Sequence, residues 1–402
     1  MPGSATVTGT GRCPAPPLSD GASMPLPVRV ATATRAASVL AIVLPAALAL
    51  LPLPHGALFM PEVAAVEWGH WLVPPAAVLF ATRSLRRRRI GTVELALVGS
   101  MAVLVWPAWA AGRIAAEVPA KLEAAFGPSG LGPDLGYSLT GLYSFPSRGA
   151  PPVEIDPGNG HRYDLYRPAS DGPTPLIVFV HGGSWRSGDR HQLPDIDHDL
   201  VARGLAVLEI EYALAPAHTF PAPLADVHAA LAWVLREGPA RGLDPARVVV
   251  VGRSAGAQLA LLAAYASDVP LVPRGVVGLY GPTDLVWAAQ HPGSRAIIDT
   301  IGLLTDYLGG PLDARRATYE RASPLRQARA DAPPTLLIYG SRDKLVSPFH
   351  GHRLAGVLSH LGVAHVHLEL PWGRHVCEAN PRGPGGQVVL AAIERFARAV
   401  CR

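Results

Sequence analysis

The 402-residue sequence predicts an α/β domain built on a mostly parallel sheet and preceded by about three transmembrane helices. Three observations support this prediction. The chain is 49% hydrophobic and only 16% charged, which is too apolar for a wholly water-soluble protein. The long apolar stretches are confined to the first third of the chain. From Arg162 onward, short runs rich in Val, Ile, Leu and Tyr alternate with segments of helical spacing.

The N-terminal third divides into an arm and a membrane region. Residues 1–26 are rich in Pro, Gly, Ala, Ser and Thr and lack apolar periodicity, so we expect a disordered arm. Residues 27–113 contain apolar stretches at about 36–53, 64–82 and 91–112, each near the ~20 residues that cross a bilayer. The alternative is three buried helices of a soluble domain, but such helices would need polar faces that these stretches lack.

The distribution of arginine predicts the orientation of these stretches. Arginines precede the first stretch, and Arg83 and Arg86–Arg89 lie between the second and third, whereas the first loop has no Lys or Arg. The positive-inside rule then places the N-terminus in the cytoplasm and everything after Arg113 on the extracytoplasmic side. Cleavage of the first stretch as a signal peptide leaves this result unchanged. The predicted side of the residues after Arg113 reverses if the second stretch does not cross the membrane.

Composition argues against several classes of partner. The net charge is +4, and the arginines form no basic stripe interleaved with aromatic residues, so we expect no nucleic acid. Cys13, Cys377 and Cys401 form no CxxC pair, so no structural zinc is expected. Cys377 and Cys401 are either free thiols or, in an oxidising compartment, a disulfide. One crowded set of potential metal ligands is better explained as the start of a solvated helix: His191, Asp195, Asp197 and His198.

The rest of the chain is predicted to be one domain behind a linker. Residues 114–144 are rich in Gly and Pro and have little periodicity, which is typical of a linker. Residues 145–402 carry the alternating pattern, which implies a mainly parallel sheet with helices on both faces. In such a sheet the functional side chains gather in the loops at the carboxyl ends of the strands.

The segment "VVVVGRSAGAQLALLAAY" places a serine between a strand and a helix. It contains G-x-S-x-G, with Gly252 and Gly256 flanking Ser254. A sharp turn of this kind exposes the serine hydroxyl and directs the N–H of Ala255 toward an oxyanion, and the helix N-terminus favours negative charge there. The alternative is a serine that only caps the helix. The strand–helix context favours Ser254 as a nucleophile.

Other strand ends supply the remaining parts of a catalytic site. Gly182 and Gly183 follow the run "LIVFV", and we expect their N–H groups to help bind an oxyanion. Asp343 follows "TLLIYG" and His375 follows the final strand, so the order Ser, Asp, His is that of a catalytic triad. The competing acid is Asp284, which we expect to cap a turn instead.

These residues resemble the α/β-hydrolase superfamily over roughly residues 145–402. The motifs "VHGGSWRSGDR", "GRSAGAQLALLAAY" and "YGSRDKLVSP" occur in the order of its feruloyl-esterase-like and hormone-sensitive-lipase-like carboxylesterases. The resemblance implies an eight-stranded, mostly parallel sheet and neither metal nor organic cofactor. Two residues depart from the pattern. Ser184 replaces the usual third glycine, and Arg253 stands where Asp, Glu or His is common; Arg253 is expected to gate the pocket, pair with an acid or face solvent.

The sequence therefore predicts a multi-pass membrane serine hydrolase that cleaves carboxylic esters through an acyl-enzyme. An amidase or exopeptidase, an acyltransferase and a non-catalytic membrane receptor are the alternatives. The insert at about residues 285–334 is long for a connection, and its segment "SRAIIDTIGLLTDYLGG" is expected either to cap an acyl pocket or to pack in the core. The oligomeric state and the natural ester are not indicated.

Overall fold

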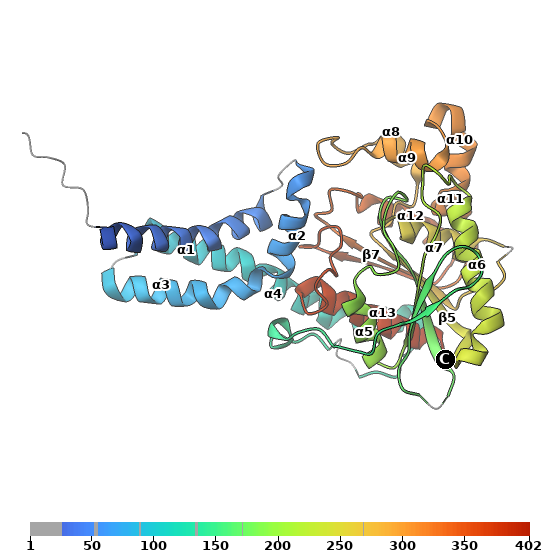
Figure 1. Cartoon of the computed structure of the whole chain (residues 1–402), viewed down its shortest axis with the longest axis horizontal. Coiled ribbons are helices and arrows are strands. Elements are labelled where there is room, and N and C mark those ends of the chain that lie inside the picture. The colour runs from blue at the N-terminus through green and yellow to red at the C-terminus, as the bar shows by residue number, and fades with distance from the viewer. Residues whose placement is uncertain (1–25, 52–54, 88–89, 133–135, 171, 268) are drawn as a thin grey trace, which may run out of the picture. The chain divides into compact units, whose positions relative to one another are not determined.

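The computed structural model describes most of the chain beyond the N-terminal arm. The described ranges are 26–51, 55–87, 90–132, 136–170, 172–267 and 269–402. The predicted arm lies outside them except for Leu26, and so do Cys13 and two arginines of the Arg86–Arg89 run. The described residues divide into two units between Ala41 and Ile42, and all the contacts described below lie within the second. Figure 1 shows the elements coloured in chain order.

The apolar N-terminal sequence forms four helices. Ile42 and Ala46 from the first pack with Ala76 of the third and with Leu97 and Leu104 of the fourth. One-turn 3-10 helices at Gly56–Leu58 and Gly69–Leu72 lie on either side of the second helix. The four helices are α1 (Leu26–Leu50), α2 (Phe59–Glu67), α3 (Val73–Arg87) and α4 (Thr92–Phe126).

The described helices differ from three straight membrane spans. Only α4, within the described residues, is long and apolar enough to cross a membrane as one helix. The segments Gly56–Glu67 and Gly69–Leu85 meet the same criteria together, but the chain bends by 65° between them. Pro74 and Pro75 explain the new helix start, because proline lacks an N–H and is tolerated in a first turn. The apolar part of α1, Ala36–Leu50, is shorter than a span.

The linker predicted for residues 114–144 is wrong over its first part, where α4 continues to Phe126. Ala115, Val118 and Leu122 are buried with the main core, because their spacing places them on one helix face. That face packs against α13 (Pro384–Val400), and the rings of Phe126 and Phe396 meet edge to face with centroids 4.8 Å apart. This packing makes the second half of α4 part of the core of the sheet-containing domain.

The following domain is built on one mixed sheet of eight strands in the order β1-β2-β4-β3-β5-β6-β7-β8. The strands from β3 to β8 are all parallel, whereas β2 runs antiparallel to β1 and β4. The strands are β1 (Val153–Ile155), β2 (Tyr163–Tyr166), β3 (Thr174–Val180), β4 (Ala206–Ile210), β5 (Leu243–Arg253), β6 (Gly275–Leu279), β7 (Thr335–Gly340) and β8 (His365–Leu370).

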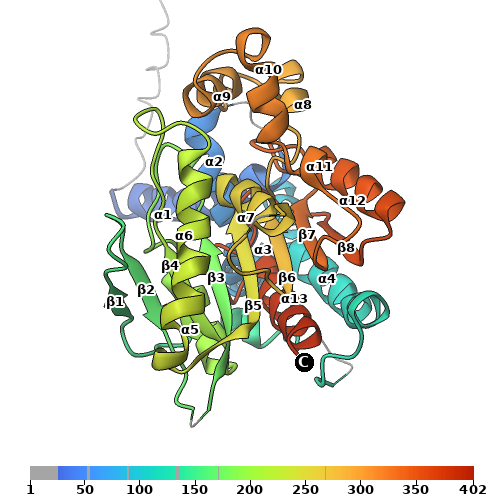
Figure 2. The ribbon, with the colours of Figure 1, turned by 90° about the vertical axis from the view of Figure 1, so that its right-hand side faces the viewer.

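Helices cover both faces of the sheet, which explains why the central strands are near-continuous apolar runs. The helices α6 (Ala222–Glu237) and α7 (Ala255–Tyr265) contact each other on one face, and α5 (Pro194–Ala202) contacts α13 on the other (Figure 2). The helix α12 (Phe349–Leu361) connects β7 to β8. The insert between β6 and β7 folds into α8 (Leu285–Gln290), α9 (Thr300–Leu308), α10 (Leu312–Arg321) and α11 (Pro324–Gln327).

Candidate active site

Ser254 occupies the abrupt turn between β5 and α7. Its backbone has φ +54° and ψ −117°, a strained conformation for a residue with a side chain. The flanking glycines make the turn possible. A Cβ on Gly252 would lie 2.2 Å from the carbonyl oxygen of Gly256, and one on Gly256 would lie 2.1 Å from that of Val180. The two glycines therefore let β5, α7 and β3 meet closely enough to hold the serine at the strand end.

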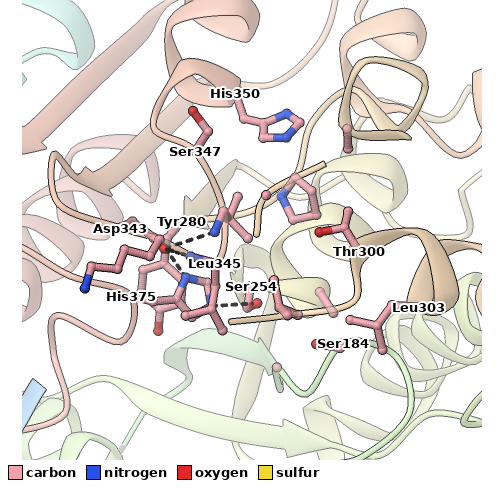
Figure 3. A pocket seen from close by; sticks show the side chains of 18 of the residues that line it. Ser184, Ser254, Tyr280, Thr300, Leu303, Asp343, Leu345, Ser347, His350 and His375 are labelled. Carbon is pink, nitrogen blue, oxygen red and sulfur yellow. Dashed lines mark hydrogen bonds and ion pairs between the residues drawn. The ribbon is translucent and has the colours of Figure 1, made fainter. Parts of the chain in front are cut away.

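Ser254, His375 and Asp343 form a hydrogen-bonded chain. Nε2 of His375 lies 2.9 Å from Oγ of Ser254, and Nδ1 lies 2.6 Å from Oδ2 of Asp343 (Figure 3). Because an ionised carboxylate can only accept, Nδ1 donates, and Nε2 of the neutral ring is left to accept the serine proton. The structure thus brings together the three residues that the sequence singled out.

Local packing fixes the acid and the base. Oδ1 of Asp343 accepts hydrogen bonds from the N–H groups of Leu345 and Val346, at 2.8 and 3.0 Å, which leaves Oδ2 to orient the imidazole. The His375 ring lies against Tyr280, with centroids 4.5 Å apart. The side chains of Asp343 and His375 are largely buried, whereas Ser254 is partly exposed to the cavity.

The N–H groups that the glycine loop after β3 leaves free differ from the oxyanion donors that the sequence predicts. The N–H of Gly182 donates to Oε1 of Gln192 at 2.8 Å, so it is engaged within the protein. Within the described residues, no hydrogen bond is formed by the N–H groups of Gly183, Ser184 or Ala255, and all three residues line the cavity. A Cβ on Gly183 would lie 1.9 Å from the carbonyl oxygen of Ser187, so only glycine fits this turn.

Arg253, for which the sequence left three roles open, is fully buried next to Ser254. Its Nη1 donates to Oε1 of Glu209 at 2.9 Å, its Nε lies 3.5 Å from Oε1 of Glu378, and its guanidinium lies 4.0 Å from the Phe179 ring centroid. Tyr280 donates its hydroxyl to Glu378 and also packs on His375. Of the expected alternatives, the structure supports pairing with acids.

This network contains more acidic than basic groups, and its pKa shifts reflect that. Burial raises the pKa of Asp197 well above the ordinary value, and the neighbouring charge of Glu209 raises it further. Burial also raises the pKa values of Glu209 and Glu378, although the charge of Arg253 opposes the change. Burial and the charge of Glu209 thus favour the protonated form of Asp197 more strongly than water would. The prediction that this segment is a solvated helix start is wrong for Asp197, which is fully buried.

A cavity of about 350 Å³ opens in front of Ser254. The insert contributes one wall through α8, α9 and their loops, and the loop after β7 contributes Leu345 and Val346 (Figure 3). The insert residues that line it are mostly apolar: Trp287, Ala288, His291, Gly293, Ile298, Thr300, Leu303 and Leu304. Such an apolar space beside a nucleophile suits the acyl or alcohol part of a substrate.

Several other candidates have structural roles. Asp284 caps α8 by accepting from the N–H of Trp287 and pairs with Arg353 at 2.6 Å, as expected for a capping residue. Cys377 and Cys401 are buried free thiols. One cluster of possible metal ligands occurs among the described residues, on α12 and β8. Its members are His352, His367 and Glu369, and an ion pair of 2.8 Å between His352 and Glu369 already explains its geometry.

Sequence reasoning missed the residues that support the site from a distance in the chain. Gln192 and Tyr280 contact the oxyanion loop and His375, respectively, and α2 approaches the same region through Phe59, whose ring centroid lies 6.3 Å from that of His375. No local pattern marks these contacts. The one sequence feature that could have indicated a contact with another segment was the presence of two cations, Lys344 and Arg374, directly beside Asp343 and His375.

The mixed eight-stranded sheet, with a strained serine at the β5–α7 turn and an Asp–His pair after β7 and β8, defines an α/β hydrolase. Comparison with known proteins agrees. Residues 163–358 match the BD-FAE family. Esterase LipQ of Mycobacterium tuberculosis is 28% identical over 303 residues, which cover 66% of this chain and 70% of LipQ. Esterase LipC of the same organism is 31% identical over 243 residues, covering 56% and 59%.

Solved structures show the same fold. An esterase of Pyrobaculum calidifontis superposes with a TM-score of 0.55 at 24% identity, covering 65% of this chain and 88% of that one. Carboxyl esterase 2 of Tuber melanosporum gives a TM-score of 0.54 at 25% identity, covering 62% and 87%. The chain is a carboxylesterase-like hydrolase with the α/β-hydrolase fold, similar to these esterases.

Proposed function

We propose that this protein is a membrane-anchored serine esterase that uses Ser254, His375 and Asp343 to hydrolyse carboxylic esters through an acyl-enzyme. The observation that supports this most strongly is the continuous hydrogen-bonded chain from Ser254 Oγ through His375 to Asp343. This chain places a base within reach of a nucleophile and an acid behind the base, which is the arrangement that acyl transfer requires.

The proposed reaction has two halves. His375 Nε2 removes the hydroxyl proton as Ser254 Oγ attacks the ester carbonyl, and the proton then passes to the departing alkoxide. Water, deprotonated by the same nitrogen, attacks the acyl-enzyme; the bond between the acyl carbon and Ser254 Oγ breaks, the acid leaves, and His375 returns the proton to Oγ. Asp343 keeps Nδ1 protonated and stabilises the imidazolium that forms in each half.

The geometry of the glycine loop revises the proposed oxyanion donors. Among the residues that the structure describes, the N–H groups of Gly183, Ser184 and Ala255 find no partner, whereas that of Gly182 donates to Gln192. Pre-positioned donors of this kind are worth about 3 to 4 kcal/mol each in other hydrolases. The missing third glycine of the motif does not remove a donor, because Ser184 still offers its backbone N–H.

The cavity favours a compact, apolar acyl group. Its volume of about 350 Å³ is near the lower end of the range for small-molecule sites. Trp287, Leu303 and Leu304 offer apolar surface, and no charged side chain from the insert lines the cavity apart from the titratable His291. We therefore expect short-chain or medium-chain esters to be better substrates than long-chain lipids.

Membrane anchoring is supported by apolar side chains that face outward from the N-terminal helices. Such exposure is unusual on a water-soluble surface and suits contact with lipid. Trp109 lies next to Arg113, and aromatic residues that are exposed beside basic ones are common at membrane interfaces. Several of these apolar residues are more than half exposed: Leu44, Val78, Leu85, Leu95 and Trp109.

The proposed orientation places the catalytic domain on the extracytoplasmic side. Glu62 lies on α2, in the segment between the first two apolar stretches, and bonds to Lys344 and Arg374, so this segment and the catalytic domain would share one side of the membrane. The arginine-rich connection between α3 and α4 would then face the cytoplasm. A compartment-sensitive reporter fused after Arg402 should be active outside, and cytoplasmic activity would contradict this orientation.

A fluorophosphonate probe together with an acyl-chain series tests the enzymatic proposal. The purified full-length chain in detergent should label at Ser254 and hydrolyse p-nitrophenyl esters with an optimum at short or medium chains. Product analysis with and without an added alcohol or amine separates hydrolysis from acyl transfer. An unlabelled Ser254 with no ester turnover would favour the non-catalytic receptor.

A further inference from the structure

The residues on either side of the catalytic acid and base are bonded to the N-terminal helices. Arg342 and Lys344 flank Asp343 in the loop after β7, and Arg374 directly precedes His375 in the loop after β8. None of these three cations takes part in the proposed chemistry. All three bind groups that belong to α1, α2 or α4.

Glu62 of α2 joins the two loops. Its Oε1 and Oε2 both lie 2.8 Å from Nζ of Lys344, and Oε2 also accepts from Nη1 of Arg374 at 2.5 Å. The Glu62 side chain is only 4% exposed, as is that of Arg374. A buried carboxylate shared by two cations forms much stronger interactions than a surface ion pair, because water does not compete for it.

The end of α1 adds a second attachment. Nη2 of Arg374 donates to the carbonyl oxygens of Leu48 and Ala49, at 3.0 and 3.1 Å, and Arg342 donates to that of Ala49 at 3.3 Å. The last turn of a helix has carbonyl groups without partners in the helix and a partial negative charge, so cations bind there favourably. The Arg342 guanidinium also lies 5.3 Å from the ring centroid of Trp106 on α4.

We propose that Glu62 is a positioning residue that holds the Asp343 and His375 loops in their catalytic geometry, so that the membrane-proximal helices complete the active site. This inference depends on the proposed function of the Ser254 site. Glu62 does not itself line the substrate cavity, and it acts through Arg374 and through Lys344, which lies at the cavity wall. Each of these cations is covalently adjacent to a triad residue, so a shift of either loop displaces the acid or the base directly.

Loss of the carboxylate leaves two neighbouring cations without their shared partner. Burial lowers the pKa of Arg374, and the charge of Glu62 is the main opposing influence. Without that charge, Lys344 and Arg374 repel each other and are expected to move apart or toward water. A displacement of about 1 Å at a catalytic group can cost ~100-fold in rate, so the effect should appear in catalysis before it appears in folding.

Glu62→Gln in the full-length chain tests this proposal. We expect kcat for p-nitrophenyl butyrate to fall about 10-fold to 100-fold, with KM changed by less than about twofold because Glu62 is not part of the cavity lining and the apolar wall of the insert is unaltered. The rate of fluorophosphonate labelling at Ser254 should fall in parallel. Glu62→Asp retains the charge on a shorter side chain and should recover part of the lost kcat.

Glu94→Gln is the matched control. Glu94 is also a buried carboxylate of the N-terminal helices paired with an arginine, Arg83 at 2.9 Å, but it has no contact with the catalytic loops. The kcat of the Glu94→Gln variant should remain near that of the wild type. The proposal is overturned if Glu62→Gln loses no more kcat than Glu94→Gln, if only KM changes, or if Glu62→Asp is as impaired as Glu62→Gln.

Two further outcomes are decisive. If Glu62→Gln does not accumulate as folded protein, Glu62→Asp replaces it, and a kcat equal to that of Glu94→Gln then overturns the proposal. If the wild type labels at Ser254 but hydrolyses no ester, the proposed esterase function fails, and the labelling rates of the same variants still decide the role of Glu62.

Discussion

Arg253 Nη1 lies 2.9 Å from Oε1 of Glu209, and both side chains are almost completely buried next to the turn that holds Ser254. The pair connects β5, which ends at Arg253, to β4 on the far side of β3. Tyr280 and Glu378 extend the network to His375. A polar core of this kind holds the β5–α7 turn while the hydroxyl of Ser254 remains accessible.

Removal of Arg253 is predicted to destabilise the protein. Arg253→Met leaves Glu209 and Glu378 buried without their cation, and breaking a buried pair in this way costs about 3 to 5 kcal/mol. The double variant Arg253→Met/Glu209→Met replaces the pair by apolar side chains and should recover much of the loss. Urea unfolding followed by tryptophan fluorescence measures both, and a single-variant loss below about 1 kcal/mol would contradict the assigned role.

Asp197 is predicted to make stability fall as pH rises. Its raised pKa means that the folded state keeps a proton that the unfolded state loses above about pH 3.9, so folding becomes less favourable at higher pH until the folded-state group ionises. Asn cannot ionise. The difference in unfolding midpoint between Asp197→Asn and the wild type should therefore become more favourable to the variant from about pH 5 to pH 8.

The matched control lies on the same helix. Asp199 pairs with Arg382 at 2.6 Å, so Asp199→Asn removes a favourable interaction and should destabilise the protein at neutral pH. A pH-independent difference for Asp197→Asn, or one that grows in favour of the wild type, would show that Asp197 is ionised in the folded protein.

The catalytic candidates could be located from the sequence because a parallel sheet gathers its carboxyl ends at one edge. Ser254, Asp343 and His375 each follow a strand of that sheet, and their approach within hydrogen-bond distance requires no knowledge of the intervening chain. The pairing of Arg253 could not be assigned, since the choice among solvent, cavity and buried acid depends on the order of the strands, and Glu209 lies on β4, which β3 separates from β5.

The N-terminal helices were harder to predict for two physical reasons. Gly and Pro after residue 113 suggested a linker, but burial of Ala115, Val118 and Leu122 against α13 outweighs the cost of Pro119 inside the helix. The contact between Glu62 and Lys344 joins residues 282 apart in the sequence, and no periodic pattern encodes such a pairing.

Asp343→Asn is predicted to lower kcat by about 10⁴-fold with little change in KM. The amide can donate to Nδ1, which favours the imidazole tautomer that carries its proton on Nε2 and cannot accept from Ser254. The measurement is the steady-state hydrolysis of p-nitrophenyl butyrate. Asp284→Asn, at the competing acid, should retain most of the activity, and the reverse ranking of the two variants would transfer the role of the acid to Asp284.

Trp287→Ala is predicted to shift the preferred ester toward longer acyl chains. The indole lines the cavity, and its removal creates space in which each additional buried methylene contributes about 0.8 kcal/mol, or roughly fourfold in kcat/KM. The acyl-chain series measures this shift. Trp68→Ala, which alters an exposed tryptophan outside the cavity, is the control and should leave the profile unchanged. An unaltered profile for Trp287→Ala would place the acyl group elsewhere.

The most direct test of the catalytic role of Ser254 is the initial rate of p-nitrophenyl butyrate hydrolysis by Ser254→Ala and by wild-type protein at equal concentrations of folded enzyme. We predict a rate at least about 10³-fold lower for the variant, because alanine removes the only atom that forms the acyl bond. Hydrolysis at the wild-type rate would contradict the assignment of Ser254 as the nucleophile.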